Sequence, residues 1–233
     1  MSGLARVMER RALLAGTLAC GAAPIRGARG DRALPSDSSG LPVPSSHALA
    51  FRLMRYGSAI GTHTLDFKPR DDTLAVTIAV DVALSLGPIP LVRYTHRNTE
   101  VWRAGRLASL DAETNRNGTQ LYMSARRVEA GLRVEGSGTD SYIASEDALP
   151  TTYWNAQMLR APMIGTQDGM LVHPRVTEKP IEPVRLASGA ETAARCYSLT
   201  GDLDLDLWYD PESHWMSMRF VVADGSVISY ERL

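Results

Sequence analysis

The residues best suited to chemistry lie on one predicted strand, residues 91–103, with the sequence LVRYTHRNTEVWR. Successive side chains of a strand point to opposite faces, so every second residue shares a face. One face carries a phenol, an imidazole, an amide and a carboxylate, which belong to Tyr94, His96, Asn98 and Glu100. An imidazole and a carboxylate are common general acid and base groups, and they can equally form a polar network inside a fold.

The other face of this strand is basic, with Arg93, Arg97 and Arg103 separated mostly by threonines. Two polar faces are unusual for a strand that follows a strongly apolar one, and either face can line a polar pocket. We favour the simpler interpretation, which is an outer strand whose basic face pairs with acidic residues on its neighbours.

Two tryptophans stand beside polar residues, in the sequences YWN (153–155) and LWYD (207–210). Each tryptophan either anchors the core through a satisfied indole N–H or lines the mouth of a ligand site, and we favour the anchor. Met218 belongs to a methionine-rich set, and methionine adapts to irregular apolar surroundings. The candidate ligand-binding residues are Tyr94, His96, Glu100, Trp154, Asn155, Trp208, Asp210 and Met218.

Other catalytic and metal-binding patterns are missing from the sequence. None of the five histidines has a second histidine two or four residues away, so we predict no metal site. There is no G-x-S-x-G or S-x-x-K motif and no phosphate-binding loop, so we assign no cofactor and no catalytic residue. Cys196 is predicted to be a small buried hydrophobic residue.

The strands that position these residues show a period of two. The C-terminal stretch 202–232 is predicted to form three antiparallel strands, because leucines alternate with aspartates over 202–207 and turn signals follow at 211–213 and at Asp224-Gly225. One face of the second of these strands is expected to carry Met216, Met218, Phe220 and Val222.

The most regular predicted strand spans residues 74–84, where an apolar residue stands at every even position. That apolar face must be buried, so Ile78 should point into the core and Thr77 should point the other way. At about 3.3 Å per residue, such a strand must bend or belong to a curled sheet.

About a dozen strands at regular spacing, with little helix between them, predict an all-β fold made of a single antiparallel curled sheet or barrel. One short helix is expected at Pro150–Arg160, with Thr151 or Thr152 as its cap.

The N-terminal residues have the pattern of an export signal. Arg10 and Arg11 precede the short apolar run Ala12–Ala23, which ends in small residues. We therefore expect export to the periplasm, and we do not favour a lipid anchor on Cys20, because a threonine stands where a leucine is usual three residues earlier. The predicted organisation is a signal peptide (1–23), a flexible linker (24–47) and an antiparallel β domain (48–233).

Composition excludes some partners. The 233-residue chain has a formal net charge of −1, which gives no argument for binding nucleic acid or an anionic membrane surface. No stretch approaches the roughly 18 apolar residues that a spanning helix needs. We therefore predict no nucleic-acid partner and no transmembrane segment, and the oligomeric state stays open.

Several short motifs are distinctive: VRYTH (92–96), WRAGRL (102–107), YWN (153–155) and LWYD (207–210). Together they resemble an uncharacterised family of exported bacterial proteins, a domain of unknown function, over nearly the whole chain after residue 48. The resemblance implies no activity. Its β-rich character is similar to that of periplasmic proteins with curled sheets, including lipoprotein carriers, which is an analogy of fold alone.

Three functions fit these observations. The first is a non-enzymatic periplasmic protein that binds an apolar or amphipathic small molecule or lipid inside a curled sheet, and we favour it. The second is a cell-envelope enzyme acting on a lipid, sugar or small metabolite, with His96 and either Glu100 or Asp210 as acid–base groups. The third is a structural or interaction module.

Overall fold

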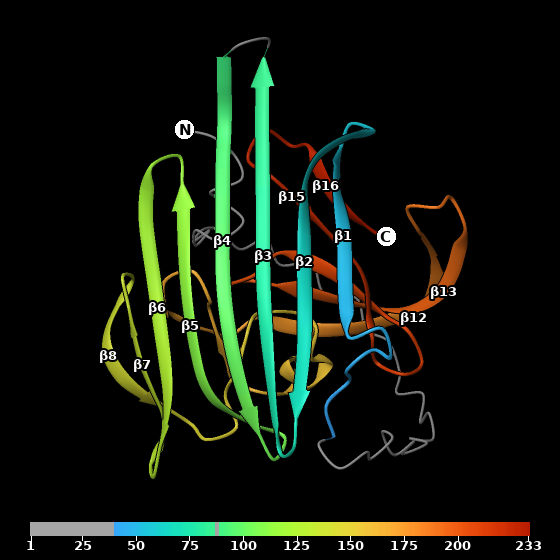
Figure 1. Ribbon diagram of the computed structural model, residues 1–233. Helices are drawn as coiled ribbons and strands as arrows, with labels where there is room; N and C mark the ends of the chain where they lie inside the picture. Colours follow the sequence, from blue (N-terminus) through green and yellow to red (C-terminus); the bar gives the residue numbers. More distant parts are fainter. Residues whose placement is uncertain (1–39, 87–88) are drawn as a thin grey trace, which may run out of the picture.

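The computed structural model describes residues 40–86 and 89–233. Thirteen strands form one antiparallel sheet in the order β12-β13-β14-β15-β16-β1-β2-β3-β4-β5-β6-β7-β8 (Figure 1). The strands of this sheet are β1 (Ala48–Arg55), β2 (Ser58–Arg70), β3 (Thr73–Leu86), β4 (Ile89–Arg103), β5 (Arg106–Arg116), β6 (Thr119–Val128), β7 (Gly131–Gly136), β8 (Thr139–Ala144), β12 (Arg175–Arg185), β13 (Glu191–Thr200), β14 (Leu205–Tyr209), β15 (Trp215–Val221) and β16 (Val227–Arg232).

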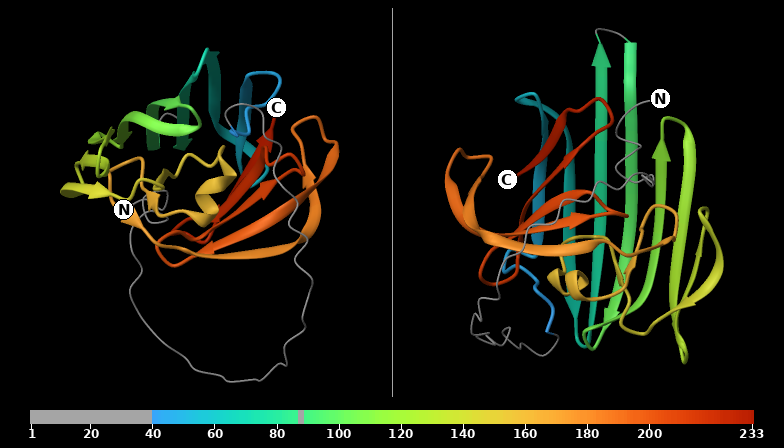
Figure 2. Two further views of the ribbon diagram at one scale, coloured as in Figure 1. Left: turned by 90° about the horizontal axis from the view of Figure 1, so that it is seen from below. Right: turned by 180° about the vertical axis from the view of Figure 1, so that it is seen from behind.

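The sheet curls without closing, because its edge strands β12 and β8 do not pair with each other. Figure 2 shows the C-terminal strands as a layer facing β1–β5, with the yellow segment of the chain between the two layers. We call residues 145–173 the covering segment. It contains a small sheet of β9 (Leu149–Pro150), β10 (Met163–Ile164) and β11 (Leu171–Val172), together with the 3-10 helix η2 (Ala156–Arg160). The all-β prediction is confirmed, and the form of the sheet is open.

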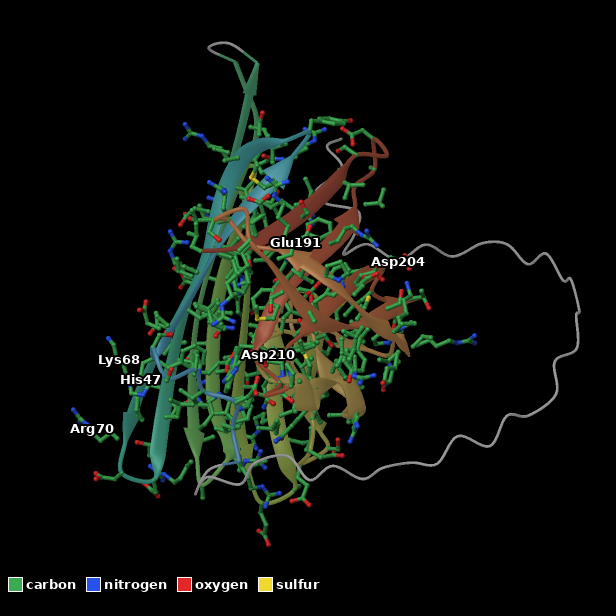
Figure 3. All side chains as sticks on the ribbon, turned by 90° about the vertical axis from the view of Figure 1, so that its right-hand side faces the viewer. His47, Lys68, Arg70, Glu191, Asp204 and Asp210 are labelled. Atoms are coloured by element: carbon green, nitrogen blue, oxygen red, sulfur yellow. The ribbon has the colours of Figure 1, made fainter. Side chains whose placement is uncertain are left out.

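The space between the two layers is filled by the apolar faces of the strands, which the alternation of apolar and polar residues predicted to be buried. On β3, the even-numbered residues from Leu74 to Val82 are buried, while Thr77 is exposed. The three C-terminal strands are also confirmed, and Gly225 takes a φ of 82° in the turn before β16, which glycine adopts without strain. Figure 3 shows the side chains packed between the layers and shows Lys68 and Arg70 of β2 pointing away from them.

The predicted helix at Pro150–Arg160 is wrong in length and in its cap. Only the 3-10 helix η2 forms, and its cap is Asn155, whose side chain accepts a hydrogen bond from the Gln157 backbone N–H. Thr151 does not begin a helix: the chain before it is paired as β9, and Trp154 donates its backbone N–H to the carbonyl of Thr152, two residues back, in place of a helical bond. Tyr153 has a φ of 65°, in the left-handed region, which also excludes a helix at that point.

A bulge separates two methionines that we expected on one face of β15. The pairing of β14 with β15 shifts between Trp208 and Tyr209, so Met216 has no partner in the ladder. Met216 packs with Trp208 and Cys196 in a small second core, while Met218 faces the main core. Cys196 is buried, as predicted.

Only part of the N-terminal region for which we made predictions belongs to the described residues. The predicted signal peptide and residues 24–39 of the predicted linker lie outside the described residues. Leu41 is buried against the main core, so the packed chain includes residues that we had expected in the linker. Across the described ranges, no helix is long and apolar enough to cross a membrane.

Candidate functional site

An inner cavity of about 90 Å³ lies within the curl of the sheet. It has room for several water molecules or a small organic guest. Its walls come from both layers and are mainly apolar, and they include Leu53, Ile78, Val80, Val82, Leu205 and Met218. Polar side chains interrupt this apolar lining in a few places, which is the usual composition of a small-molecule site.

Two histidines line the inner cavity from neighbouring positions across the sheet. His63 on β2 and His96 on β4 both stand opposite Val80 on β3, so all three form one row across three strands. Facing residues on such a row point to the same side of the sheet. His63 and His96 therefore flank Val80 at the cavity wall.

His96 is held by the next strand. Its Nδ1 lies 2.8 Å from the hydroxyl oxygen of Thr114 on β5, which leaves Nε2 as the ring nitrogen available to a guest. Burial lowers the pKa of His96 to about 4, with a smaller contribution from the charge of Arg97. The imidazole is therefore neutral at physiological pH and can donate or accept one hydrogen bond according to its tautomer.

His63 is enclosed by aromatic rings. Its ring centroid lies 5.1 Å from that of Trp215 and 5.8 Å from that of Tyr230, both in edge-to-face geometry. Its two nitrogens have no hydrogen-bond partner among the described residues. Burial lowers the pKa of His63 to about 3, with His96 adding a smaller effect, so this histidine is also neutral.

Three tyrosines bring phenol groups to the same cavity, from β4, from the covering segment and from β16: Tyr94, Tyr153 and Tyr230. Tyr94 accepts a hydrogen bond from Nε2 of Gln167 at 2.8 Å. Burial raises the pKa of Tyr153 to about 12 and also raises the pKa values of the other two phenols. All three are therefore neutral hydroxyl groups.

Tyr153 is positioned by a strained turn. Its φ of 65° is uncommon for a large side chain, and such strain persists only where the surroundings enforce it. The hydroxyl of Tyr209 on β14 donates to the carbonyl of Tyr153 at 2.7 Å and so connects this turn to the C-terminal layer.

An outer cavity of about 170 Å³ shares Thr151, Gln167 and Leu203 with the inner one. Its lining is more polar. It includes the charged residues Arg116, Asp168 and Asp202, whereas no charged side chain of the described chain lines the inner cavity. The two cavities together present an apolar end and a polar end.

Glu100 belongs to a different part of the interior. Its Oε2 accepts the indole N–H of Trp102 at 2.7 Å and that of Trp154 at 3.0 Å. Burial raises the pKa of Glu100 to about 7, although the indole hydrogen bonds act in the opposite direction. Neither Glu100 nor Trp154 lines the inner cavity.

β4 lies between β3 and β5, so the expected outer strand is wrong, and His96, Asn98 and Glu100 form a buried polar row on its inner face. Its other face is basic and pairs with acids, as Arg97 does with Asp81.

The remaining candidates lie apart from the inner cavity. Asn155 caps η2 and lines a surface groove near His214. Trp208 donates its indole N–H to Glu182 on β12 at 2.7 Å, in the second core, which agrees with an anchoring role. Asp210 begins the turn between β14 and β15 (Figure 3). The structure therefore brings together Tyr94, His96 and Met218 and separates the other five candidates from them.

The turn after β14 collects three groups that are able to hold a metal ion. Ligand atoms of Asp210, Glu212 and His214 lie within 4.8 Å of one another. The sequence argument against metals overlooked that Glu212 and Asp210 stand two and four residues before His214. Asp210 is already used as a turn residue, since its Oδ1 accepts the backbone N–H groups of Glu212 and His214.

Sequence reasoning missed His63, Tyr153, Gln167 and Tyr230 as cavity residues. These side chains come from three separate regions of the chain and meet only because β16 pairs with β1 and the covering segment crosses the interior. His63 was the one with a signal, since it stands on the same strand face as the buried Leu65 and Phe67.

Similarity to known proteins extends over most of the chain. A family model described as a domain of unknown function, DUF6134, matches residues 51–233. The chain belongs to the DUF6134 family. No curated protein matches this DUF6134 chain.

The DUF6134 chain is also similar to a solved structure, described as a beta-barrel-like protein of domain of unknown function DUF1849 from Brucella abortus. The TM-score is 0.54 at 9% identity, and the match covers 80% of this chain and 94% of that one. At this identity the likeness concerns the fold alone, and it agrees with a strongly curled sheet.

Proposed function

We propose that this protein binds a small amphipathic molecule within its curled sheet and does so without catalysis. The observation that carries the proposal is the pair of adjoining cavities, of which the inner is mainly apolar and the outer has charged residues at its wall. An amphipathic guest would place its apolar part in the inner cavity and its polar part in the outer one. The export pattern at residues 10–23 supports a site of action in the periplasm.

Size limits the guest. A cavity of about 90 Å³ takes a ring or a short chain and not a whole lipid acyl chain. If about 200 Å² of apolar guest surface is buried at about 25 cal/mol per Å², the gain is roughly 5 kcal/mol before the cost of association. Because about 5 kcal/mol corresponds to a Kd of roughly 0.2 mM before that cost, we expect affinities in the millimolar range.

The enzyme hypothesis receives less support from the same geometry. His96 lines the inner cavity, while the carboxylate of Glu100 is engaged by two indole N–H groups outside that lining. Asp210 lies in a turn and is also absent from it. An acid–base pair must reach the same reacting atoms, and neither carboxylate is placed with His96 to do so.

Native mass spectrometry of the protein purified from its own periplasm tests the proposal. We expect a bound small molecule of a few hundred daltons or less, released on unfolding, and competition between that molecule and small hydrophobic probes. Protein that carries nothing and binds no probe, with an interior closed to guests, would instead support a structural or interaction module.

A further inference from the structure

The inner cavity contains hydrogen-bonding groups and no charge. Among the described residues that line it, none is Lys, Arg, Asp or Glu. Its two histidines are neutral at physiological pH, because burial lowers the pKa of His63 to about 3 and that of His96 to about 4. The chemistry that the cavity offers is therefore that of neutral phenol, imidazole, hydroxyl and amide groups.

The phenol groups are available as donors. Tyr94 accepts a hydrogen bond from Nε2 of Gln167 at 2.8 Å, so its own hydroxyl proton stays available to another acceptor. Tyr153 and Tyr230 bring two further phenol hydroxyls to the lining of the cavity. All three tyrosines line the one inner cavity of about 90 Å³, so their phenol groups serve the same small space.

The donors come from rigid surroundings. Tyr94 and Tyr230 stand on strands of the large sheet, and the Tyr153 turn is held through its carbonyl by Tyr209. Donors that are already in place lose little freedom when a guest arrives. Phenol groups that line a mainly apolar space therefore suit a guest with an acceptor oxygen, which has two lone pairs.

From this arrangement, and resting on the function proposed above, we infer that the inner cavity selects an uncharged guest with a carbonyl oxygen, such as a ketone, ester or quinone. The carbonyl oxygen accepts from one or two of the phenols of Tyr94, Tyr153 and Tyr230, and the carbon skeleton lies against Val80, Met218 and their neighbours. A carboxylate or an ammonium group would lose its hydration there with no opposite charge to replace it, so the charged group of a fatty acid or an amine is excluded from the inner cavity.

A matched ligand series tests this inference. Acetophenone, ethylbenzene, benzoate and benzylamine share one ring and differ in the short substituent. Each is titrated into the full-length protein at pH 7.5 by isothermal titration calorimetry. We expect acetophenone to bind several-fold more tightly than ethylbenzene, which is what one hydrogen bond contributes, and both to bind at least tenfold more tightly than the two ions.

Two variants assign the effect to the phenols. Tyr94→Phe removes one hydroxyl and should reduce acetophenone affinity several-fold while leaving ethylbenzene affinity within twofold. Tyr153→Phe serves the same purpose if Tyr94→Phe lowers the melting temperature strongly. The control is Tyr122→Phe on β6, since the Tyr122 side chain is 57% exposed, and this change should alter neither affinity.

The outcomes separate the inference from the function on which it rests. If ethylbenzene binds as tightly as acetophenone, or if Tyr94→Phe and Tyr153→Phe leave their ratio unchanged, the carbonyl inference fails and the binding function stands. Benzoate as the tightest ligand would overturn the exclusion of charge. If none of the four compounds binds, the proposed function itself is contradicted.

Discussion

Trp154 donates its indole N–H to the carboxylate of Glu100 at 3.0 Å, across 54 positions of the chain. Trp102, two residues from Glu100, donates to the same oxygen at 2.7 Å. Trp154 is fully buried and packs edge-to-face on Phe67 and Trp102. One buried carboxylate thus fastens the covering segment to β4, and its ionisation should affect the stability of the whole fold.

The first prediction concerns Glu100→Gln. Burial raises the pKa of Glu100 from 4.5 to about 7, so the carboxyl group is more easily protonated in the folded protein than in the unfolded chain. Its contribution to stability is present below pH 4.5 and is lost as the pH rises through 7. Glutamine carries no charge, so the variant should be more stable at pH 8 by up to about 3 kcal/mol and should gain less at pH 5.

Urea denaturation at the two pH values measures this difference. The matched control is Glu113→Gln on β5, where the side chain is exposed and no comparable gain is expected. A Glu100→Gln protein that loses stability equally at pH 5 and pH 8 would show that the ionised carboxylate is the form that the fold requires.

The second prediction concerns acid stability. Burial lowers the pKa of His63 to about 3 and that of His96 to about 4, whereas in the unfolded chain both stay near 6.5. Their contribution to stability is therefore present above pH 6.5 and is lost as the pH falls toward 4. The wild-type chain binds one proton at each of these two histidines when it unfolds in acid. The His63→Leu variant binds one proton fewer, so the slope of its unfolding free energy against pH should be smaller by about 1.4 kcal/mol per pH unit.

The measurement is the free energy of unfolding at several pH values between 4.5 and 6.5. It is best made in the Glu100→Gln background, because Glu100 shifts the pH dependence in the opposite direction over this range. An unchanged pH dependence in His63→Leu would mean that His63 is accessible to protons in the folded state.

The third prediction tests which way β3 faces. Ile78 is 1% exposed, and Ile78→Asp would bury a carboxylate without a partner, so we expect a loss of several kcal/mol. Thr77→Asp places the same group in solvent and should change the free energy of unfolding by about 0.5 kcal/mol or less. Thermal melting compares the two, and equal effects would contradict the observed orientation of the strand.

The fourth prediction tests the location of the guest. Met218→Trp should fill the inner cavity, so the affinity for small apolar probes should fall at least tenfold, with an overpacking cost of about 1–3 kcal/mol. Met54→Trp makes the same chemical change on β1 at a residue outside the lining and should leave probe binding intact. Unaltered binding by a folded Met218→Trp protein would place the guest elsewhere.

Local patterns in the sequence determined which elements form and which way most of them face. The alternation on β3 needs no distant information, because a strand with one apolar face can be buried in only one way. The hairpins of the C-terminal strands follow in the same manner from turn residues such as Asp224-Gly225. The shared face of Tyr94, His96, Asn98 and Glu100 was likewise visible in the spacing, although its burial and its surroundings were not.

Only the tertiary structure decided which of these residues act together. His96 faces the inner cavity and Glu100 does not, because Trp154 from the covering segment occupies the space beside Glu100. Met216 and Met218 face different cores because one bulge changes the register of β15, and such an insertion leaves no regular mark in the sequence.

The cavity itself depends on contacts between distant parts of the chain. Tyr94, Tyr153 and Tyr230 meet because β16 pairs with β1 and because the chain between β8 and β12 crosses the interior. The sequence by itself determined an all-β protein with a curled sheet. The long-range pairing and the covering segment decided where that sheet leaves a space and which polar groups face it, because these are properties of the packed chain and not of any one strand.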